Sequence, residues 1–267
     1  MVAGDFTGDG LTDLLVRTTQ GVIPSAQGMV LHEHALRVTR ELTSASDKIK
    51  QLSGRMTGQL SVGAVPLAVM LLLPETLRTF GRDFPDMRLR ISEELYPHQL
   101  QRLRKGEVDV ALGGIPQGLP SGEFVVEALL ETTMEVVVRK GSAREQARSL
   151  QELSTARWVY TGASSEEGYA KLFFESHGLP PPPVGAVVNS TLALLSIVTT
   201  GDYVALMPRQ IAAHPLARSF LSVVPVRERG LPLTVGAIVR ADTATSPAVR
   251  HLIAHLHRAA YQANKTG

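Results

Sequence analysis

The part of the chain after Gly58 alternates short apolar runs with amphipathic segments, and this order constrains the fold more than any other feature of the sequence. Short apolar runs predict buried strands, whereas longer segments with apolar residues every three to four positions predict helices. A strand–helix–strand order places the strands in parallel, with each helix crossing one face of the sheet. We predict a strand at 60–65, a helix at 67–84, a strand at 87–93, a helix at 97–105 and a strand at 108–113.

A second set of elements repeats this order further along the chain. Strands predicted at 133–139 and 233–240 flank the second set, and a last helix is expected from Ser246 to about Tyr261. Two similar α/β units joined by extended strands predict two lobes that face each other across a cleft. The second set consists of a strand at 158–160, a helix at 169–176, a strand at 185–188, a helix at 191–199 and a strand at 203–207.

Residues 28–57 carry a heptad seam, in which apolar residues are spaced alternately four and three positions apart. This period of 3.5 residues is typical of a helix that packs along a partner helix. We therefore predict a long linker helix that forms a homodimer or homotetramer; the alternative is an amphipathic helix packed on its own domain. The seam consists of Leu31, Ala35, Val38, Leu42, Ala45, Ile49 and Leu52.

The composition is that of a globular protein, and it excludes some kinds of functional site. Hydrophobic residues make up 44% of the chain and charged residues 19%, and the formal net charge of +2 does not indicate a strongly basic surface. Because cysteine is absent, disulfides, thiolate nucleophiles and cysteine-ligated metals are excluded. Membrane-spanning and secretory segments are not evident in the sequence, so we expect a cytoplasmic protein with no membrane partner and no cofactor.

Oxygen-bearing side chains near the start of the chain have the spacing of a calcium loop. An EF-hand loop needs a bidentate glutamate at its twelfth position, where this chain has Val16. The segment also resembles one calcium-binding FG-GAP repeat, but a single copy is present. We expect a flexible terminus rather than a metal site at Asp5, Thr7, Asp9, Gly10 and Asp13.

Three histidines near the end of the chain, His251, His255 and His257, are the other candidate metal ligands. The first two are four residues apart on the predicted last helix, a spacing that can hold a metal ion. A third ligand is not evident nearby in the sequence, so we predict an exposed polar stripe and no metal. A paired nucleophile and base are not evident either, and we expect no enzymatic activity.

The candidate binding residues lie where a predicted strand ends just before a helix. Free backbone N–H groups and the positive end of the helix dipole at such places favour a carboxylate or sulfonate. Ser190 could donate its hydroxyl, and Tyr96 and Leu67 could flank a ring. The alternative is ordinary N-capping by Ser190 and core packing by Leu67. The candidate set consists of Val65, Pro66, Leu67, Tyr96, Ser165, Glu166, Glu167, Ser190 and Thr191.

Several motifs, in the same order, resemble LysR-type transcriptional regulators. Residues 14–35 resemble the wing and the following helix of that family's DNA-binding unit. Residues 74–86 and 103–112 resemble the first lobe of its effector domain, and residues 201–209 resemble a strand and turn of its second lobe. The resemblance covers residues 14 to about 262.

The resemblance implies an α/β fold with a two-lobed, periplasmic-binding-protein-like effector domain made of two Rossmann-like subdomains. It implies that a small organic anion, such as an aromatic carboxylate or sulfonate, binds in the interlobe cleft to control DNA-dependent transcription. Similar regulators place effector contacts at positions that match Leu67, Tyr96, Gly114, 166–168 and Thr191. The implied domains are a winged helix-turn-helix remnant at 1–27, the linker helix at 28–57, lobe I at 58–133 and 234–267, and lobe II at 134–233.

The chain departs from the family pattern before the wing, where family members carry a helix-turn-helix that reads the major groove. Residues 1–13 stand in its place and cannot form a recognition helix, so we expect an N-terminally truncated form that does not bind DNA sequence-specifically by itself. Two alternatives remain open. One is a periplasmic-type solute-binding protein with the same two-lobe design, and the other is an enzyme built on this scaffold.

Overall fold

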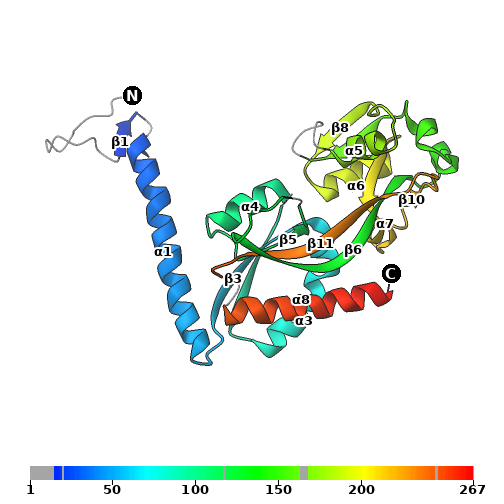
Figure 1. Cartoon of the computed structure of the whole chain (residues 1–267). Coiled ribbons are helices and arrows are strands. Elements are labelled where there is room, and N and C mark those ends of the chain that lie inside the picture. The colour runs from blue at the N-terminus through cyan, green and yellow to red at the C-terminus, as the bar shows by residue number, and fades with distance from the viewer. Residues whose placement is uncertain are drawn as a thin grey trace. The chain divides into compact units, whose positions relative to one another are not determined.

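The computed structural model describes residues 15–19, 21–94, 96–116, 118–162, 168–243 and 246–266, and the chain divides into two compact units between Thr57 and Gly58. The first unit contains an antiparallel hairpin of β1 (Leu15–Thr18) and β2 (Gly21–Pro24), followed by helix α1 (Ala26–Leu52) (Figure 1). The Ser25 side chain caps α1 by accepting a hydrogen bond from the Gly28 N–H at 3.0 Å. The hairpin lies where the family resemblance implies a wing.

The second unit is built on one mixed β-sheet. Its strand order is β4-β3-β5-β11-β6-β9-β7-β8, and β10 also pairs with β6. The strands are β3 (Gly58–Ala64), β4 (Met87–Glu93), β5 (Val110–Gly114), β6 (Phe124–Arg139), β7 (Trp158–Thr161), β8 (Val184–Val188), β9 (Val204–Pro208), β10 (Leu221–Val223) and β11 (Leu231–Arg240).

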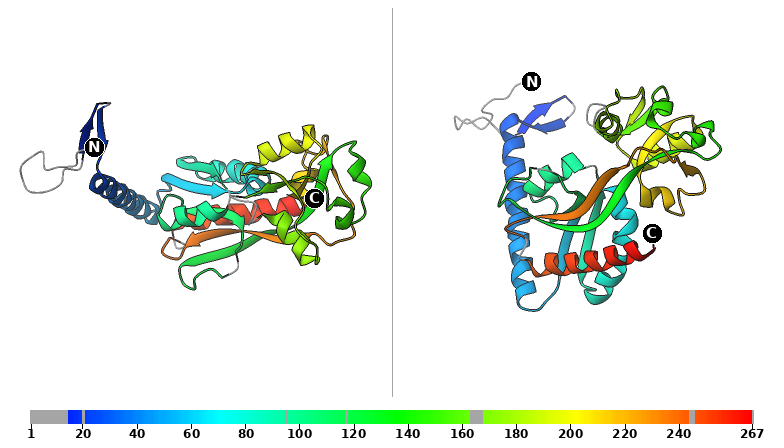
Figure 2. Two further views of the ribbon diagram at one scale, coloured as in Figure 1. Left: turned by 90° about the horizontal axis from the view of Figure 1, so that it is seen from above. Right: turned by 45° about the vertical axis from the view of Figure 1, so that its right-hand side comes forward.

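Two lobes share this sheet because β6 and β11 run antiparallel through both of them (Figure 2). Lobe I contains the parallel strands β3, β4 and β5, and lobe II contains the parallel strands β7, β8 and β9. The sequence predicted only 133–139 of β6, whereas the strand starts at Phe124. Its first half contains two groups of three apolar residues, each followed by a glutamate, Glu127 or Glu131, a pattern that fits a helix as well as a strand.

The predicted helices appear in the predicted order, but one of them is divided in two, and the short helices of lobe II given below as α7, η1 and η2 were not predicted. The expected single helix at 67–84 is two helices, because Pro74 has no N–H to continue the hydrogen-bond ladder and occupies the first turn of a new helix. Helices α2 (Pro66–Leu71), α3 (Leu73–Asp83), α4 (Tyr96–Arg104) and α8 (Pro247–Thr266) belong to lobe I. Helices α5 (Tyr169–Ser176), α6 (Thr191–Thr200) and α7 (Arg209–Ala213) belong to lobe II, with two short 3₁₀ helices, η1 (Ala143–Gln146) and η2 (Leu150–Leu153).

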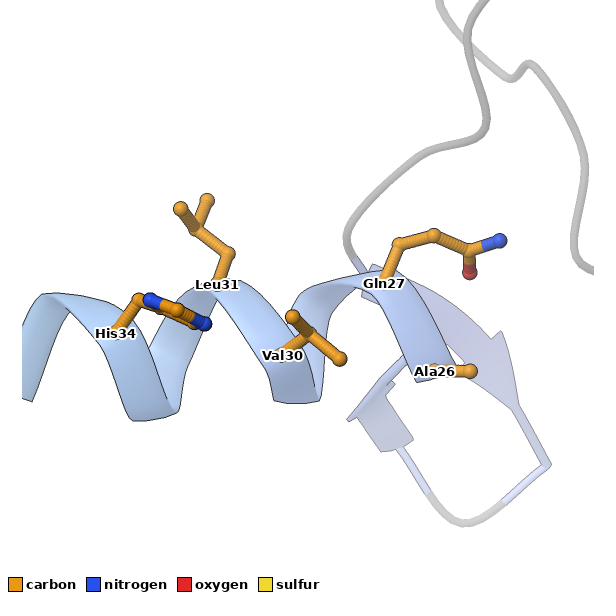
Figure 3. A pocket seen from close by; sticks show the side chains of 5 residues that line it. All are labelled: Ala26, Gln27, Val30, Leu31 and His34. Atoms are coloured by element: carbon orange, nitrogen blue, oxygen red, sulfur yellow. The ribbon is translucent and has the colours of Figure 1, made fainter. Parts of the chain in front are cut away.

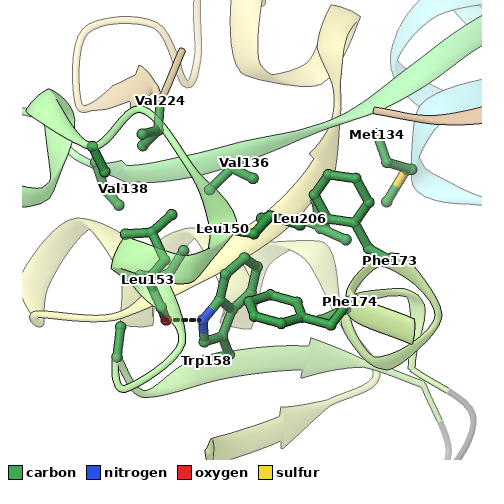
Figure 4. Close-up of a cluster of buried hydrophobic side chains, with 14 of the residues drawn as sticks. Met134, Val136, Val138, Leu150, Leu153, Trp158, Phe173, Phe174, Leu206 and Val224 are labelled. Atoms are coloured by element: carbon green, nitrogen blue, oxygen red, sulfur yellow. Dashed lines mark hydrogen bonds between the residues drawn. The ribbon is translucent and has the colours of Figure 1, made fainter. Parts of the chain in front are cut away.

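The core of lobe II is centred on Trp158, which is fully buried (Figure 4). Its indole Nε1–H donates a hydrogen bond to the Leu153 carbonyl at 3.1 Å, and its ring makes an edge-to-face contact with Phe174 at 5.2 Å between centroids. Phe173 and Leu206 extend the same cluster. The cluster fixes β7 against η2 and α5, and so positions the strand ends described below.

His255 corrects the prediction of an exposed histidine stripe on the last helix. Its side chain is only 5% exposed because this face of α8 packs on α3. The imidazole Nδ1 lies 2.8 Å from the Thr79 hydroxyl oxygen, which itself donates to the Glu75 carbonyl. Since that hydroxyl proton is already used, the imidazole Nδ1–H donates to it. The ring also makes an edge-to-face contact with Phe80.

The environment of His255 predicts a pH-dependent stability. Burial lowers the pKa of His255, Arg258 lowers it further, and the carboxylate of Asp83 opposes this shift. Because the folded-state pKa lies below the unfolded value of about 6.5, the unfolded chain binds more protons at acidic pH. The stabilising contribution is therefore complete above about pH 6.5 and is lost as the pH falls through the window below it.

We expect H255N to reduce this pH dependence. Urea unfolding at about pH 7.5 and about pH 5 should show a smaller loss of unfolding free energy on acidification for H255N than for the wild type. H257N provides the matched control, since His257 is exposed on the same helix and contacts Glu127 at 2.7 Å. Equal losses in the wild type and H255N would show that His255 does not carry the effect.

Candidate functional site

A cleft of about 910 Å³ opens between the two lobes of the second unit. Its lining comes from the carboxyl ends of β3, β4 and β5 in lobe I and of β7, β8 and β9 in lobe II. In open α/β sheets these ends are where crossover helices begin and where ligands bind. The floor includes Met134 of β6 and Leu233 of β11, the two strands that join the lobes.

The first predicted group lies in this cleft as a set. Val65, Pro66 and Leu67 form the turn from β3 into α2, and all three line the cleft. The Val65 N–H donates to the Leu112 carbonyl at 2.8 Å, which ties the turn to β5. Leu67 is only 2% exposed, so it serves the core of lobe I as well as the cleft wall.

The remaining predicted residues have different positions. Thr191 lines the cleft at the start of α6, whereas Ser190 is the N-cap of that helix and accepts a hydrogen bond from the Ala193 N–H at 3.4 Å. Ser190 is not among the cleft-lining residues. Its contact is that of an ordinary N-cap, which is the alternative to ligand binding that the sequence left open. The backbone of Tyr96 begins α4, and nothing is described for its side chain. Ser165, Glu166 and Glu167 lie outside the described residues.

Tyr169, at the start of α5, is a cleft residue that the sequence argument missed. A Cβ placed on Gly114 of lobe I would lie 3.8 Å from the Tyr169 hydroxyl, so this side chain of lobe II reaches toward lobe I. The residue is 37% exposed, yet its neighbours partly desolvate the hydroxyl, and this burial raises the pKa of Tyr169. The phenol therefore stays protonated at neutral pH and can donate a hydrogen bond.

The lobe I rim of the cleft is acidic. Glu93, Glu94 and His98 line it at the end of β4 and the start of α4, and the described lining residues include neither lysine nor arginine. Glu94 forms an ion pair with Arg102, which also donates to Ser92 at 3.0 Å. The sequence signal for this rim is a pair of glutamates at the end of a predicted strand.

The lobe II wall of the cleft offers neutral hydrogen-bonding groups. Asn189 and Thr191 lie at the end of β8 and the start of α6, and Thr161 ends β7. Leu172 and Leu194 supply apolar surface beside them. This arrangement suits recognition of a small molecule with an apolar body and few polar groups.

Neither a metal centre nor a membrane-spanning helix is found among the described residues. Within these ranges, three or more histidine or carboxylate side chains do not gather where they could hold a metal ion. The calcium-like spacing at 5–13 lies outside the described residues. Among the helices described, none has the length and apolar character needed to cross a bilayer.

The predicted dimerisation residues all lie on α1, and each is exposed within the single chain. Leu42 and Ile49 are each 68% exposed and Leu52 is 75% exposed, which is unusual for large apolar side chains. Near the start of the helix, Val30, Leu31 and neighbouring residues line a shallow apolar depression of about 450 Å³ (Figure 3). A helix that packs on a partner helix exposes apolar side chains in this way in the single chain.

Residues 53–260 match the family model of the LysR substrate binding domain. The chain belongs to this LysR family. Among curated proteins, it is 27% identical over 245 residues to the HTH-type transcriptional regulator GalR of Pseudomonas putida, covering 90% of this chain and 61% of GalR. It is 24% identical over 250 residues to GbpR of Azospirillum brasilense, covering 92% of this chain and 73% of GbpR. This LysR chain thus spans about three fifths of the length of GalR.

Solved structures of LysR regulators share the fold. OxyR of Corynebacterium glutamicum superposes with a TM-score of 0.67 at 21% identity, covering 94% of this chain and 80% of OxyR. The LysR family regulator CbnR gives a TM-score of 0.66 at 18% identity, covering 89% of this chain and 82% of CbnR. These similarities confirm the two-lobed α/β fold that the resemblance implied.

Proposed function

We propose that this LysR chain is the effector-binding and oligomerising part of a transcriptional regulator, and that a small organic anion binds in its interlobe cleft. The observation that carries the proposal is the cleft itself. It lies between two lobes, is lined by the strand ends of both, and belongs to a chain of this family. The family match also agrees with the expectation that the chain is a receptor rather than an enzyme.

The polarity of the cleft supports one orientation for the anion. Glu93 and Glu94 on the lobe I rim repel a negative group, although Arg102 partly neutralises Glu94. On the lobe II wall, the first turns of α5 and α6 present backbone N–H groups, with Tyr169 and Thr191 as side-chain donors. The carboxylate or sulfonate therefore points toward lobe II, and the apolar body lies against residues such as Leu67 and Leu172.

Binding would act through the relative position of the lobes. A ligand that contacts both walls favours a closed arrangement in proportion to its differential affinity for the closed and open states. β6 and β11 are the two strands that connect the lobes, so they are the elements that must bend. In a regulator of this family, the paired α1 helices would transmit this change to the DNA-binding heads.

Solved structures of related regulators support the link between effector sensing and DNA binding. CbnR has also been solved as a full-length protein in complex with its target DNA, with a TM-score of 0.67 to this chain at 18% identity. The regulatory domain of CcmR from Synechocystis has been solved in complex with 2-PG, with a TM-score of 0.66 at 15% identity. We propose that this chain supplies the effector-sensing part of such a regulator.

Ligand-induced thermal stabilisation tests the cleft. We expect a panel of aromatic carboxylates and sulfonates to contain a compound that raises the Tm by roughly 5–10 °C at about one hundred times its Kd. T191W fills the cleft with an indole ring and should remove this rise. T200W is the matched control, since Thr200 is exposed at the far end of the same helix and does not line the cleft.

The same measurement can reject the proposal. A panel without any stabilising compound would contradict the sensing of this ligand class. A Tm rise that persists unchanged in T191W would place the bound compound outside the cleft.

A further inference from the structure

A second groove, of about 570 Å³, lies apart from the cleft in the second unit. It is bounded by the start of α7, the turn that leads into β11, the middle of β6 and the end of α8. Helix α7 packs on β9 and β10 of lobe II, whereas α8 packs on α3 of lobe I. The groove therefore touches elements of both lobes.

The positive charge of this groove comes from two arginines. Arg209 and Arg229 both line it, and in the described part of the chain neither guanidinium group has an ion-pair or hydrogen-bond partner. Glu131 is the one acidic residue among the described lining residues, so two positive charges and one negative charge leave a formal charge of +1. Thr234 and Asn264 add neutral hydrogen-bonding groups to the lining.

The backbone that carries each arginine has a restricted conformation, although both side chains are exposed. Arg209 is the first residue of α7 and directly follows Pro208, which limits the conformations of the chain before it. Arg229 precedes Gly230, where an added Cβ would lie only 2.5 Å from the Met134 carbonyl oxygen. The turn that carries Arg229 is therefore pressed against β6 and can tolerate only glycine at the point of contact.

A buried threonine and a side-chain hydrogen bond hold the wall of the groove together. Thr132 of β6 is 8% exposed, and its hydroxyl donates a hydrogen bond to the side-chain carbonyl of Gln210 on α7. Leu233 of β11 lines both this groove and the interlobe cleft. The two sites are thus separated by little more than the strands that connect the lobes.

We propose that this groove binds a small oxyanion, held by the guanidinium groups of Arg209 and Arg229, at a site separate from the cleft. Guanidinium groups recognise carboxylate and phosphate through paired, charge-assisted hydrogen bonds. Two such groups on one groove suit a ligand with more than one anionic oxygen. Polycarboxylates and phosphates share this chemistry, and the experiment below separates them.

Isothermal titration calorimetry with citrate and with inorganic phosphate, each up to millimolar concentration, tests the site. We expect at least one of the two to bind, and the tighter one identifies the ligand class. R209A and R229A should each weaken binding about tenfold or more, because each removes a charge-assisted contact. R209K should weaken it less, since lysine keeps the charge but not the planar fork.

Two control variants, R218A and T191W, show whether binding depends on this groove. Arg218 is an exposed arginine of lobe II outside the groove, so R218A should bind as tightly as the wild type. T191W, which fills the cleft, should also keep full affinity for the oxyanion. The proposal is overturned if neither anion binds, if R209A and R229A bind as the wild type does, or if T191W abolishes binding. The last outcome would place the anion in the cleft.

Discussion

The double variant L42D/I49D is expected to be monomeric under conditions in which the wild-type chain is a dimer. Both side chains belong to the heptad seam of α1, and each is 68% exposed in the single chain. In a two-stranded coiled coil the two substitutions would change four buried side chains, each worth roughly 1.5–3 kcal/mol. A loss of roughly 6 kcal/mol or more raises the dissociation constant by about four orders of magnitude.

Sedimentation equilibrium gives the mass directly, and a matched variant separates the seam from the rest of the helix. L36D/T43D also places two aspartates seven residues apart on α1, but beside the seam, and should remain dimeric. Far-ultraviolet circular dichroism should show that both variants keep the fold of the second unit. A wild-type monomer, or equal dissociation of the two double variants, would rule out the seam as the dimer interface.

Trp158 is expected to be the most costly single side chain to remove. Truncation of a fully buried aromatic residue to alanine typically costs about 3–5 kcal/mol, because the lost contacts leave a cavity. In W158A the Leu153 carbonyl also loses its hydrogen-bond donor, and Phe174 loses its edge-to-face partner. For a domain of this size we expect the Tm to fall by roughly 6–20 °C.

A conservative variant separates packing from hydrogen bonding at this position. W158F keeps a ring but removes the Nε1–H donor, so it should cost only about 1–2 kcal/mol. Urea unfolding followed by circular dichroism gives both values. A loss below about 1 kcal/mol for W158A would mean that the lobe II core does not depend on this residue.

Local pattern alone identified most of the elements. The strand at Met87–Glu93 and the helix at Tyr169–Ser176 were predicted with the same bounds that the structure has. Errors occurred where short segments carried little periodicity or an ambiguous one. The short helix α7 and the three-residue strand β10 had no clear pattern, and the first half of β6 was compatible with a helix.

The candidate site was only partly accessible to the sequence argument. Val65, Pro66, Leu67 and Thr191 line the cleft because strand ends in parallel sheets meet at one edge, which is a local rule. Tyr169 was missed, because its position in the cleft depends on its reach from lobe II toward Gly114 of lobe I. The roles of Tyr96, Ser165, Glu166, Glu167 and Ser190 in binding stay predictions.

The sequence by itself determined the α/β alternation and the heptad seam on α1, because both are periodic patterns set by neighbours a few residues apart. Tertiary structure alone decided that β6 and β11 join both lobes in one sheet, with Leu231 opposite Met134 and Arg240 opposite Phe124. It also decided that His255 is buried against α3 and that Arg209 and Arg229 share a groove. Such contacts join residues far apart in the chain, and their free energy depends on packing that no local period records.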